Sequence, residues 1–167
     1  PHRVLAEASV SLGMGEVVAL TGENGSGKST LIEALAGIIP LREGEVAWYS
    51  ESGQIVIRDS EGRRNPPPAM GLTLQKDGMC GDETVSERLS LALSVAGFSP
   101  DKGQISGLLD NWGLVHRSNE RISHLSGGLR RRLSVLCGLA PAALSEHPTV
   151  VLLDEPSEGL DDSSKDT

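Results

Sequence analysis

The stretch Gly22-Glu23-Asn24-Gly25-Ser26-Gly27-Lys28-Ser29-Thr30 decides the fold class of this chain. It matches the phosphate-binding pattern G-x-x-x-x-G-K-S/T at every fixed position. Glycines let the backbone wrap closely around an anion, and the amides of the loop and of the following helix point at the phosphates. The pattern predicts that Lys28 contacts the β- and γ-phosphates of a nucleoside triphosphate and that the Ser29 hydroxyl reaches a Mg²⁺ ion.

The sequence on both sides of this loop supports the match. An apolar run at residues 15–20 predicts a short strand, and apolar residues recur at helical spacing after Thr30. A strand, a glycine loop and a helix follow one another in the required order. This order argues against the alternative, a glycine-rich turn that fits the pattern by chance.

The composition limits the number of domains and the classes of partner. A length of 167 residues suggests a single domain. The net charge of −8 does not indicate a broad attraction to nucleic acid or to anionic lipid. No apolar run approaches the roughly 20 residues needed to cross a bilayer. Cys80 and Cys137 form no C-x-x-C pair, which predicts free thiols in a reducing compartment, although a disulfide between them stays open.

The remaining chain predicts alternating strands and helices, as in an α/β fold. Residues 44–48 and 54–58 resemble the two strands of an antiparallel hairpin, and residues 70–74 a brief strand. Thr84 and Glu87 form the pattern of a capping box that opens a helix. Further helices are expected at 104–114 and after Ser126, and the apolar run 150–153 is typical of a central parallel strand.

Four further segments take their places around the glycine loop: Gln75 after a strand, LSGG at 125–128 before a helix, VVLLDE at 150–155 and GLD at 159–161. This order resembles the nucleotide-binding domain of the ABC ATPases. The glycine loop corresponds to the Walker A motif of that family, Gln75 to its Q-loop glutamine, LSGG to its signature, VVLLDE to its Walker B motif and GLD to its D-loop. The resemblance covers about residues 15–161, and LSGG with DEP and GLD at this spacing is far more specific than a Walker A motif alone.

The resemblance implies which residues bind ATP and Mg²⁺. Asp154 would hold the metal together with Ser29 and Gln75, and Glu155 would act as the general base, with Lys28 and Gln75 as the other catalytic residues. ATP would be bound by Gly22, Glu23, Asn24, Gly25, Ser26, Gly27, Lys28, Ser29, Thr30, Ser126, Gly127, Gly128 and Asp161. The run Arg130-Arg131-Arg132 is interpreted as a solvated helix face rather than a nucleic-acid patch.

The resemblance also implies a fold and a domain organisation. The expected fold is a P-loop NTPase core with a mostly parallel sheet, an N-terminal antiparallel β hairpin region and a helical signature subdomain at about 76–140. All of this would form a single ABC-type ATP-binding domain at 1–167, incomplete at its C-terminus. The reason is that the family places a histidine that contacts the γ-phosphate beyond the D-loop, and no histidine here can be assigned to it. Residues 1–14 also lack an aromatic residue that could stack on adenine.

Partners follow from the resemblance too. In the family, the signature of one domain closes on the γ-phosphate bound by a second ATP-binding domain, as a homodimer or heterodimer. Separate transmembrane subunits would dock on residues 76–84, which implies a cytoplasmic protein at the inner face of the membrane, with no direct nucleic-acid contact. LSGGLRRRLSV resembles ABC-2-type exporters and favours export.

Two other functions remain open at this point. A soluble non-transport ABC ATPase that acts on ribosomes or DNA is the main alternative, although translation-factor members read DEPTNHLD where this chain reads DEPSEGLD. A regulatory domain that binds ATP without turnover is the third, and intact Lys28, Asp154 and Glu155 argue against it. The sequence does not identify the transported substrate.

Overall fold

The computed structural model describes residues 5, 7–50, 53–65, 69–76 and 78–157. Its contacts divide the chain into two compact units, Pro1–Pro68 and Ala69–Thr167. No helix in the described part of the chain is long and apolar enough to span a membrane.

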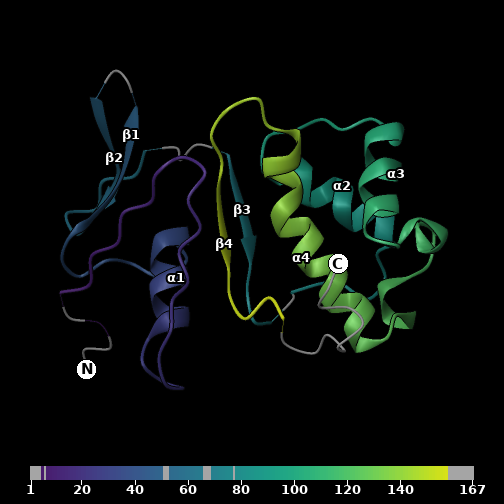
Figure 1. The fold of residues 1–167 in the computed structure, drawn as a ribbon, viewed down its shortest axis with the longest axis horizontal. Helices are drawn as coiled ribbons and strands as arrows, with labels where there is room; N and C mark the ends of the chain where they lie inside the picture. Colours follow the sequence, from purple (N-terminus) through teal and green to yellow (C-terminus); the bar gives the residue numbers. More distant parts are fainter. Residues whose placement is uncertain (1–4, 6, 51–52, 66–68, 77, 158–167) are drawn as a thin grey trace. The chain divides into compact units, whose positions relative to one another are not determined.

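The described residues of the first unit include the glycine loop, a helix and a hairpin (Figure 1). Helix α1 covers Lys28–Ala36, and strands β1 (Glu45–Ser50) and β2 (Gly53–Asp59) pair antiparallel. The predicted hairpin is therefore confirmed, with each strand one or two residues longer than the apolar pattern suggested. Gly37, at a φ of 76°, ends α1 because its left-handed backbone turns the chain out of the helix.

The strand predicted at residues 15–20 is not formed in this unit. These residues are exposed, and Val17 is 95% exposed. The ladders among the described residues are those of β1 with β2 and of β3 with β4, so the apolar run has no ladder partner there. An apolar sequence favours a strand, but the hydrogen bonds that define one come from a neighbouring strand.

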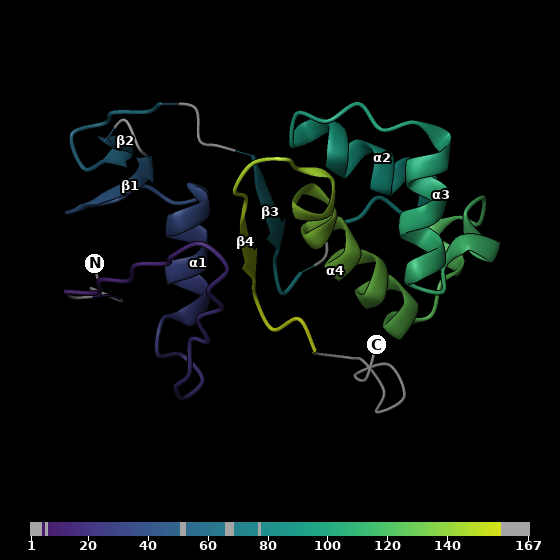
Figure 2. The same ribbon diagram turned by 45° about the horizontal axis from the view of Figure 1, so that its top comes forward.

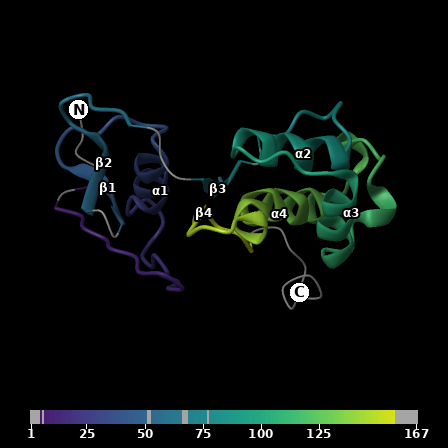
Figure 3. The same cartoon turned by 90° about the horizontal axis from the view of Figure 1, so that it is seen from above.

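The second unit places helices against a two-stranded parallel sheet (Figures 1 and 2). Its elements are β3 (Met70–Thr73), α2 (Val85–Val95), α3 (Lys102–Asn111), the 3₁₀ turns η1 (Val115–Arg117) and η2 (Ile122–His124), α4 (Gly127–Leu144) and β4 (Val150–Leu153). Helix α4 packs on both strands, α2 packs on α4, and α3 packs on α2 (Figure 3). The predicted parallel strand at 150–153 is confirmed, and it pairs with β3 in the register Met70 to Val150.

The backbone of α4 approaches β3 unusually closely. A Cβ added to Gly71 would lie 1.8 Å from the carbonyl oxygen of Gly138, and a Cβ on Gly138 would lie 2.1 Å from Oγ1 of Thr73. Between these contacts, Thr73 Oγ1 donates a buried hydrogen bond of 3.1 Å to the carbonyl oxygen of Ser134. The absence of side chains at the two glycines therefore fixes the distance between the helix and the sheet.

The apolar core of the second unit joins the three helices. Leu89 and Leu93 of α2 meet Leu109 of α3 and Leu133 and Leu136 of α4 in one buried cluster. Burial of about 25 cal/mol per Å² of apolar surface makes this cluster the main stabilising term of the unit.

Both cysteines are free thiols, as expected from the sequence. Cys80 is exposed, whereas Cys137 is buried in the helical cluster. Burial raises the pKa of the Cys137 thiol to about 12. The thiol therefore stays protonated at neutral pH and packs as a small apolar group.

The predicted capping box at the start of α2 is present. The amide of Glu87 donates to Thr84 Oγ1 at 3.3 Å, and the amide of Thr84 donates to the Glu87 carboxylate at 2.8 Å. Hydrogen bonds from the backbone and the side chain of Thr84 lower the pKa of Glu87. A lowered pKa means that this contribution to stability is present at neutral pH and is lost as the pH falls through the pKa of the folded state.

Replacing Thr84 with alanine is expected to lower the free energy of unfolding by about 1 kcal/mol, because the first turn of α2 loses its cap. Thr84→Ser keeps the hydroxyl and is the matched control, expected to stay near the wild type. Urea unfolding at neutral pH measures both. An alanine variant as stable as the serine variant would show that the cap contributes nothing.

Candidate nucleotide-binding site

The glycine loop of the first unit is shaped by backbone conformations that favour glycine. Gly22, Gly25 and Gly27 have φ values of 154°, 83° and 98°. A Cβ on Gly22 would lie 2.9 Å from Oγ of Ser26, so a side chain there would also collide with the loop. The pattern of glycines read from the sequence is thus required by the loop itself.

Lys28 holds this loop in place from the first residue of α1. Its Nζ donates to the carbonyl oxygens of Gly22 and Glu23 at 2.8 and 2.9 Å. The ammonium group therefore lies across the loop, at the positive end of the helix dipole. Ser29 and Thr30 follow in the first turn of α1, and Asn24 is exposed at the tip of the loop. In a loop of this kind, the backbone amides and the lysine ammonium group together bind an anion.

The second unit brings three predicted site residues together at one edge of its sheet. Because β3 and β4 are parallel, Gln75 and the pair Asp154 and Glu155 follow strands that end at the same edge. Nε2 of Gln75 donates to Oε2 of Glu155 at 3.2 Å, across 80 residues of sequence. The amide of Asp154 donates to the carbonyl oxygen of Thr73 at 2.8 Å. The resemblance to the ABC ATPases named these residues, and the sheet places them side by side.

The two neighbouring carboxylates differ in their surroundings. Asp154 is 5% exposed, whereas Glu155 is exposed to solvent. Glu155 also has a φ of 47°, a left-handed conformation that costs a residue other than glycine about 1–2 kcal/mol. One carboxylate is thus held in the fold, and the other is open to a reacting molecule.

The donor atoms at this edge are suited to a hard divalent cation. Mg²⁺ prefers oxygen ligands and is usually held by one or two carboxylates together with substrate phosphates. Asp154 supplies a carboxylate, and the Gln75 amide keeps its oxygen available while its nitrogen bonds Glu155. Among the described residues, no three His, Cys, Asp or Glu side chains cluster as a dedicated metal site.

Arg131 is a site residue that the sequence interpretation missed. The arginine run 130–132 was expected to be a solvated helix face, and for Arg131 that expectation is wrong. Arg131 is 7% exposed, and its guanidinium donates to backbone carbonyl oxygens at the ends of both β3 and β4. A signal was present in the sequence: Ser134 and Gly138 are small residues three and seven positions later, on the face of α4 that approaches the sheet.

The signature residues lie at the first turn of α4. Ser126 is the N-cap, and its Oγ accepts a hydrogen bond of 3.3 Å from the amide of Leu129. Gly127 and Gly128 open the helix, and a Cβ on Gly127 would meet nothing within 4 Å. The helix expected after Ser126 is confirmed, and its start leaves space in front of Gly127. Asp161, the predicted D-loop residue, lies outside the described residues.

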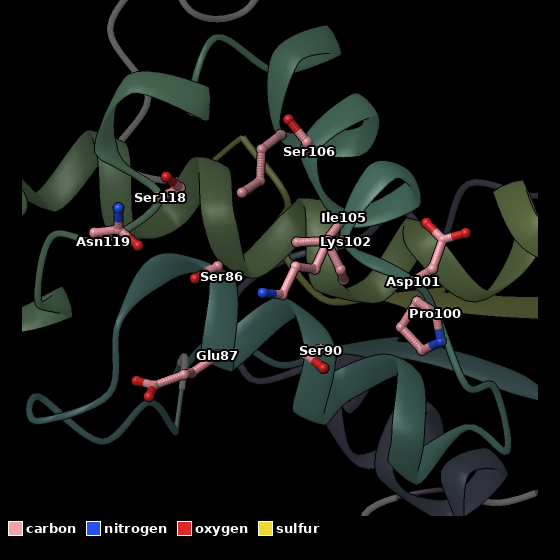
Figure 4. A pocket seen from close by; sticks show the side chains of 11 residues that line it. Ser86, Glu87, Ser90, Pro100, Asp101, Lys102, Ile105, Ser106, Ser118 and Asn119 are labelled. Atoms are coloured by element: carbon pink, nitrogen blue, oxygen red, sulfur yellow. The ribbon is translucent and has the colours of Figure 1, made fainter.

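A separate hollow of about 410 Å³ lies between α2 and α3 (Figure 4). Its lining includes Glu87, Asp101 and Lys102, with Ser118 and Asn119 at one end. None of the predicted ATP or Mg²⁺ ligands contributes to it.

Sequence comparison identifies a family and a relative of this chain. The sequence model of the family described as ABC transporter matches residues 5–158. The lipoprotein-releasing system ATP-binding protein LolD of Saccharophagus degradans is 31% identical over 160 residues, which are 95% of this chain and 68% of that protein.

Solved structures give the same result for the fold. A nucleotide-free ATP-binding cassette from an ABC transporter matches with a TM-score of 0.64 and 25% identity, over 94% of this chain and 64% of that chain. A putative metal-chelate type ABC transporter in an inward-facing conformation gives 0.60 and 25%, over 93% of this chain and 55% of that chain. A putative ABC transporter ATP-binding protein from Pyrococcus furiosus gives 0.62 and 22%, over 87% of this chain and 64% of that chain. This chain spans less than two thirds of the length of each of these three chains. Their similarity to it confirms the predicted P-loop α/β fold.

Proposed function

We propose that this chain, which belongs to the ABC transporter family of ATPases, is the ATP-hydrolysing motor of a membrane transporter. The observation that carries the proposal is the hydrogen bond between Gln75 and the exposed Glu155, beside the buried Asp154. The exposed carboxylate can activate a water molecule, and the buried carboxylate can bind a metal ion. The glutamine holds the exposed carboxylate beside the buried one. We further propose that residues 1–167 form a single ATP-binding domain with a helical subdomain at about 76–140.

ATP and Mg²⁺ are the proposed ligands. The amides of residues 22–30 and the Lys28 ammonium bind the phosphates, and the Ser29 hydroxyl, Gln75 and Asp154 serve the metal. When bound, Mg²⁺ neutralises charge on the β- and γ-phosphates. The P-loop lysine is already positioned by its bonds to Gly22 and Glu23, so little side-chain order is lost when a phosphate binds.

Hydrolysis uses Glu155 as the general base. Its carboxylate accepts a proton from the attacking water, and the Gln75 amide holds one carboxylate oxygen so that the other faces the water. Asp154 is buried and bonded through its backbone to Thr73, which keeps it at the sheet edge during turnover. The chain therefore divides metal binding and proton transfer between two consecutive carboxylates.

Each chain supplies the glycine-loop half of one ATP site and the signature half of another. Ser126, Gly127 and Gly128 form a helix start with open space in front of it, suited to a phosphate. We propose that this start and Asp161 meet the ATP held by a second ATP-binding domain. Closure then follows ATP binding, and loss of the γ-phosphate allows reopening.

The family and a relative support the proposed transport partners. LolD, by its name, belongs to a lipoprotein-releasing system. Together with the LSGGLRRRLSV signature helix, this relative favours movement of substrate out of the membrane or the cell. We propose separate transmembrane subunits that contact residues 76–84, which would place the protein at the cytoplasmic face of a membrane.

Purification of the tagged full-length protein from its own cells is expected to recover membrane-spanning proteins, because residues 76–84 dock them. Lys76→Glu reverses a charge in that segment and is expected to reduce the recovery. Lys102→Glu makes the same change on α3 and is the matched control. Recovery of ribosomal proteins or DNA instead, equal for all three forms, would support the non-transport alternative.

A further inference from the structure

One guanidinium group collects the carbonyl oxygens of four residues. Nη1 of Arg131 donates to Leu74 O at 2.8 Å and to Gln75 O at 3.4 Å. Nη2 donates to Asp154 O at 2.6 Å and also to Glu155 O. The four oxygens belong to two pairs of consecutive residues, one pair after β3 and one pair after β4.

Each pair of carbonyl oxygens flanks the Cα atom of one residue. The carbonyl oxygens of Leu74 and Gln75 belong to the two peptide planes that flank the Cα of Gln75. The oxygens of Asp154 and Glu155 flank the Cα of Glu155 in the same way. Because φ and ψ are the only soft backbone angles of a residue, holding both flanking planes fixes its backbone. Arg131 therefore holds the backbone of the two residues whose side chains bond each other.

The backbone of Glu155 needs such support. Its φ of 47° is unfavourable for a residue with a side chain, so an unsupported chain would return to an extended or helical conformation. That change would swing the carboxylate away from Gln75. Hydrogen bonds from a charged donor are stronger than those between neutral groups, so the bonds from Arg131 can offset the cost of this conformation.

Arginine is suited to this position in a way that lysine is not. The guanidinium is a planar fork whose two terminal nitrogens point at two groups of acceptors at once, whereas an ammonium is a compact point charge. The group is buried, its described hydrogen bonds are all to backbone carbonyls, and its Nε has no hydrogen-bond partner. The buried positive charge is thus stabilised by the dipoles of backbone carbonyl groups rather than by a carboxylate.

We propose that Arg131 is a positioning residue that sets the geometry of the Gln75 and Glu155 pair and links it to the signature helix. The inference rests on the proposed ATPase function. Arg131 lies in the second turn of α4, whose N-cap is Ser126, so a displacement of the signature helix along the sheet reaches both residues through one side chain. Arg131 contacts no reacting atom itself.

The test compares ATP turnover and ATP affinity in the full-length protein. Arg131→Ala and Arg131→Lys are expected to lower kcat about 100-fold, the cost of a misplaced catalytic group, with the affinity for ATP unchanged. Millimolar guanidinium ion is expected to restore part of the kcat of Arg131→Ala, because it can occupy the vacated fork site. The same ion is expected not to restore Glu155→Gln. Arg117→Ala, which removes a surface arginine paired with Glu120, is the matched control and keeps wild-type turnover.

Several results would overturn the inference. A folded Arg131→Ala or Arg131→Lys with wild-type kcat would do so, as would a loss of kcat in a folded Arg131→Ala that guanidinium leaves unchanged. If Arg131→Ala does not fold, a folded Arg131→Lys whose ATP affinity falls with its kcat would count equally against positioning. Failure of the proposed function has a different signature: the wild type itself would not turn over ATP, and both proposals would fall together.

Discussion

Glu155→Gln is expected to lower ATP turnover by about 100- to 10,000-fold and to leave ATP binding intact, because the glutamine cannot accept the proton of the attacking water. The substitution keeps the size of the side chain and its ability to bond Gln75, so the sheet edge is preserved. Steady-state turnover and direct ATP binding, measured on the same preparation, separate the two effects.

The control for this substitution is Glu146→Gln, which makes the same chemical change at an exposed position after α4. It is expected to keep the turnover of the wild type. A Glu155→Gln protein that hydrolyses ATP as fast as this control would remove Glu155 from the role of general base.

Gly71→Ala is expected to lower the free energy of unfolding by about 3 kcal/mol. The added Cβ would lie 1.8 Å from the carbonyl oxygen of Gly138, and backbone atoms of a packed helix cannot move aside as a flexible side chain can. The substitution must therefore push α4 away from β3. The buried hydrogen bond from Thr73 to Ser134 crosses the same interface and would lengthen.

Gly107→Ala is the matched control for this prediction. Gly107 lies within α3, where an added Cβ meets nothing within 4 Å. Alanine is expected to raise stability there by about 0.5–1 kcal/mol, because it is the better helix former. Urea unfolding should therefore shift the two variants in opposite directions. Equal midpoints would show that the second unit tolerates a wider separation of helix and sheet.

The interface of α4 with the sheet also connects stability to the site. Gly138 and Ser134 hold α4 close to β3, and Arg131 lies one turn before Ser134 on the same face. The guanidinium reaches the ends of β3 and β4 only because the helix lies this close. Changes at the two glycines are thus expected to disturb Gln75 and Glu155 as well as the fold.

Features that depend on local sequence were predictable. Lys28 and the glycines lie within a few residues of one another, and the φ values of the loop require glycine. The caps at Thr84 and Ser126 are equally local, since each oxygen accepts from an amide three residues later. Short-range patterns of this kind fix a conformation before any tertiary contact is known.

Features that depend on distant partners were harder to predict. Residues 15–20 have the composition of a strand but no ladder in the described first unit. Arg131 resembles a surface arginine until the carbonyl oxygens of Leu74 and Asp154 are placed beside it, 57 and 23 residues away in the sequence. Gln75 and Glu155 were predicted from their place in the motifs, while the bond between them emerged from the parallel pairing of β3 and β4.

ATP-dependent dimer formation is the most direct test of the proposal that each chain contributes the signature half of a site to a partner. The measurement is the molar mass of the full-length Glu155→Gln protein in solution, without nucleotide, with ADP and with ATP and Mg²⁺. Two ATP-binding domains are expected to associate in the presence of ATP and Mg²⁺, and not in the other two conditions. Gly128→Arg places a bulky charge at the signature helix start, and it is expected to abolish the association while ATP binding persists. A Glu155→Gln protein that is saturated with ATP and shows the same mass in all three conditions would contradict the account.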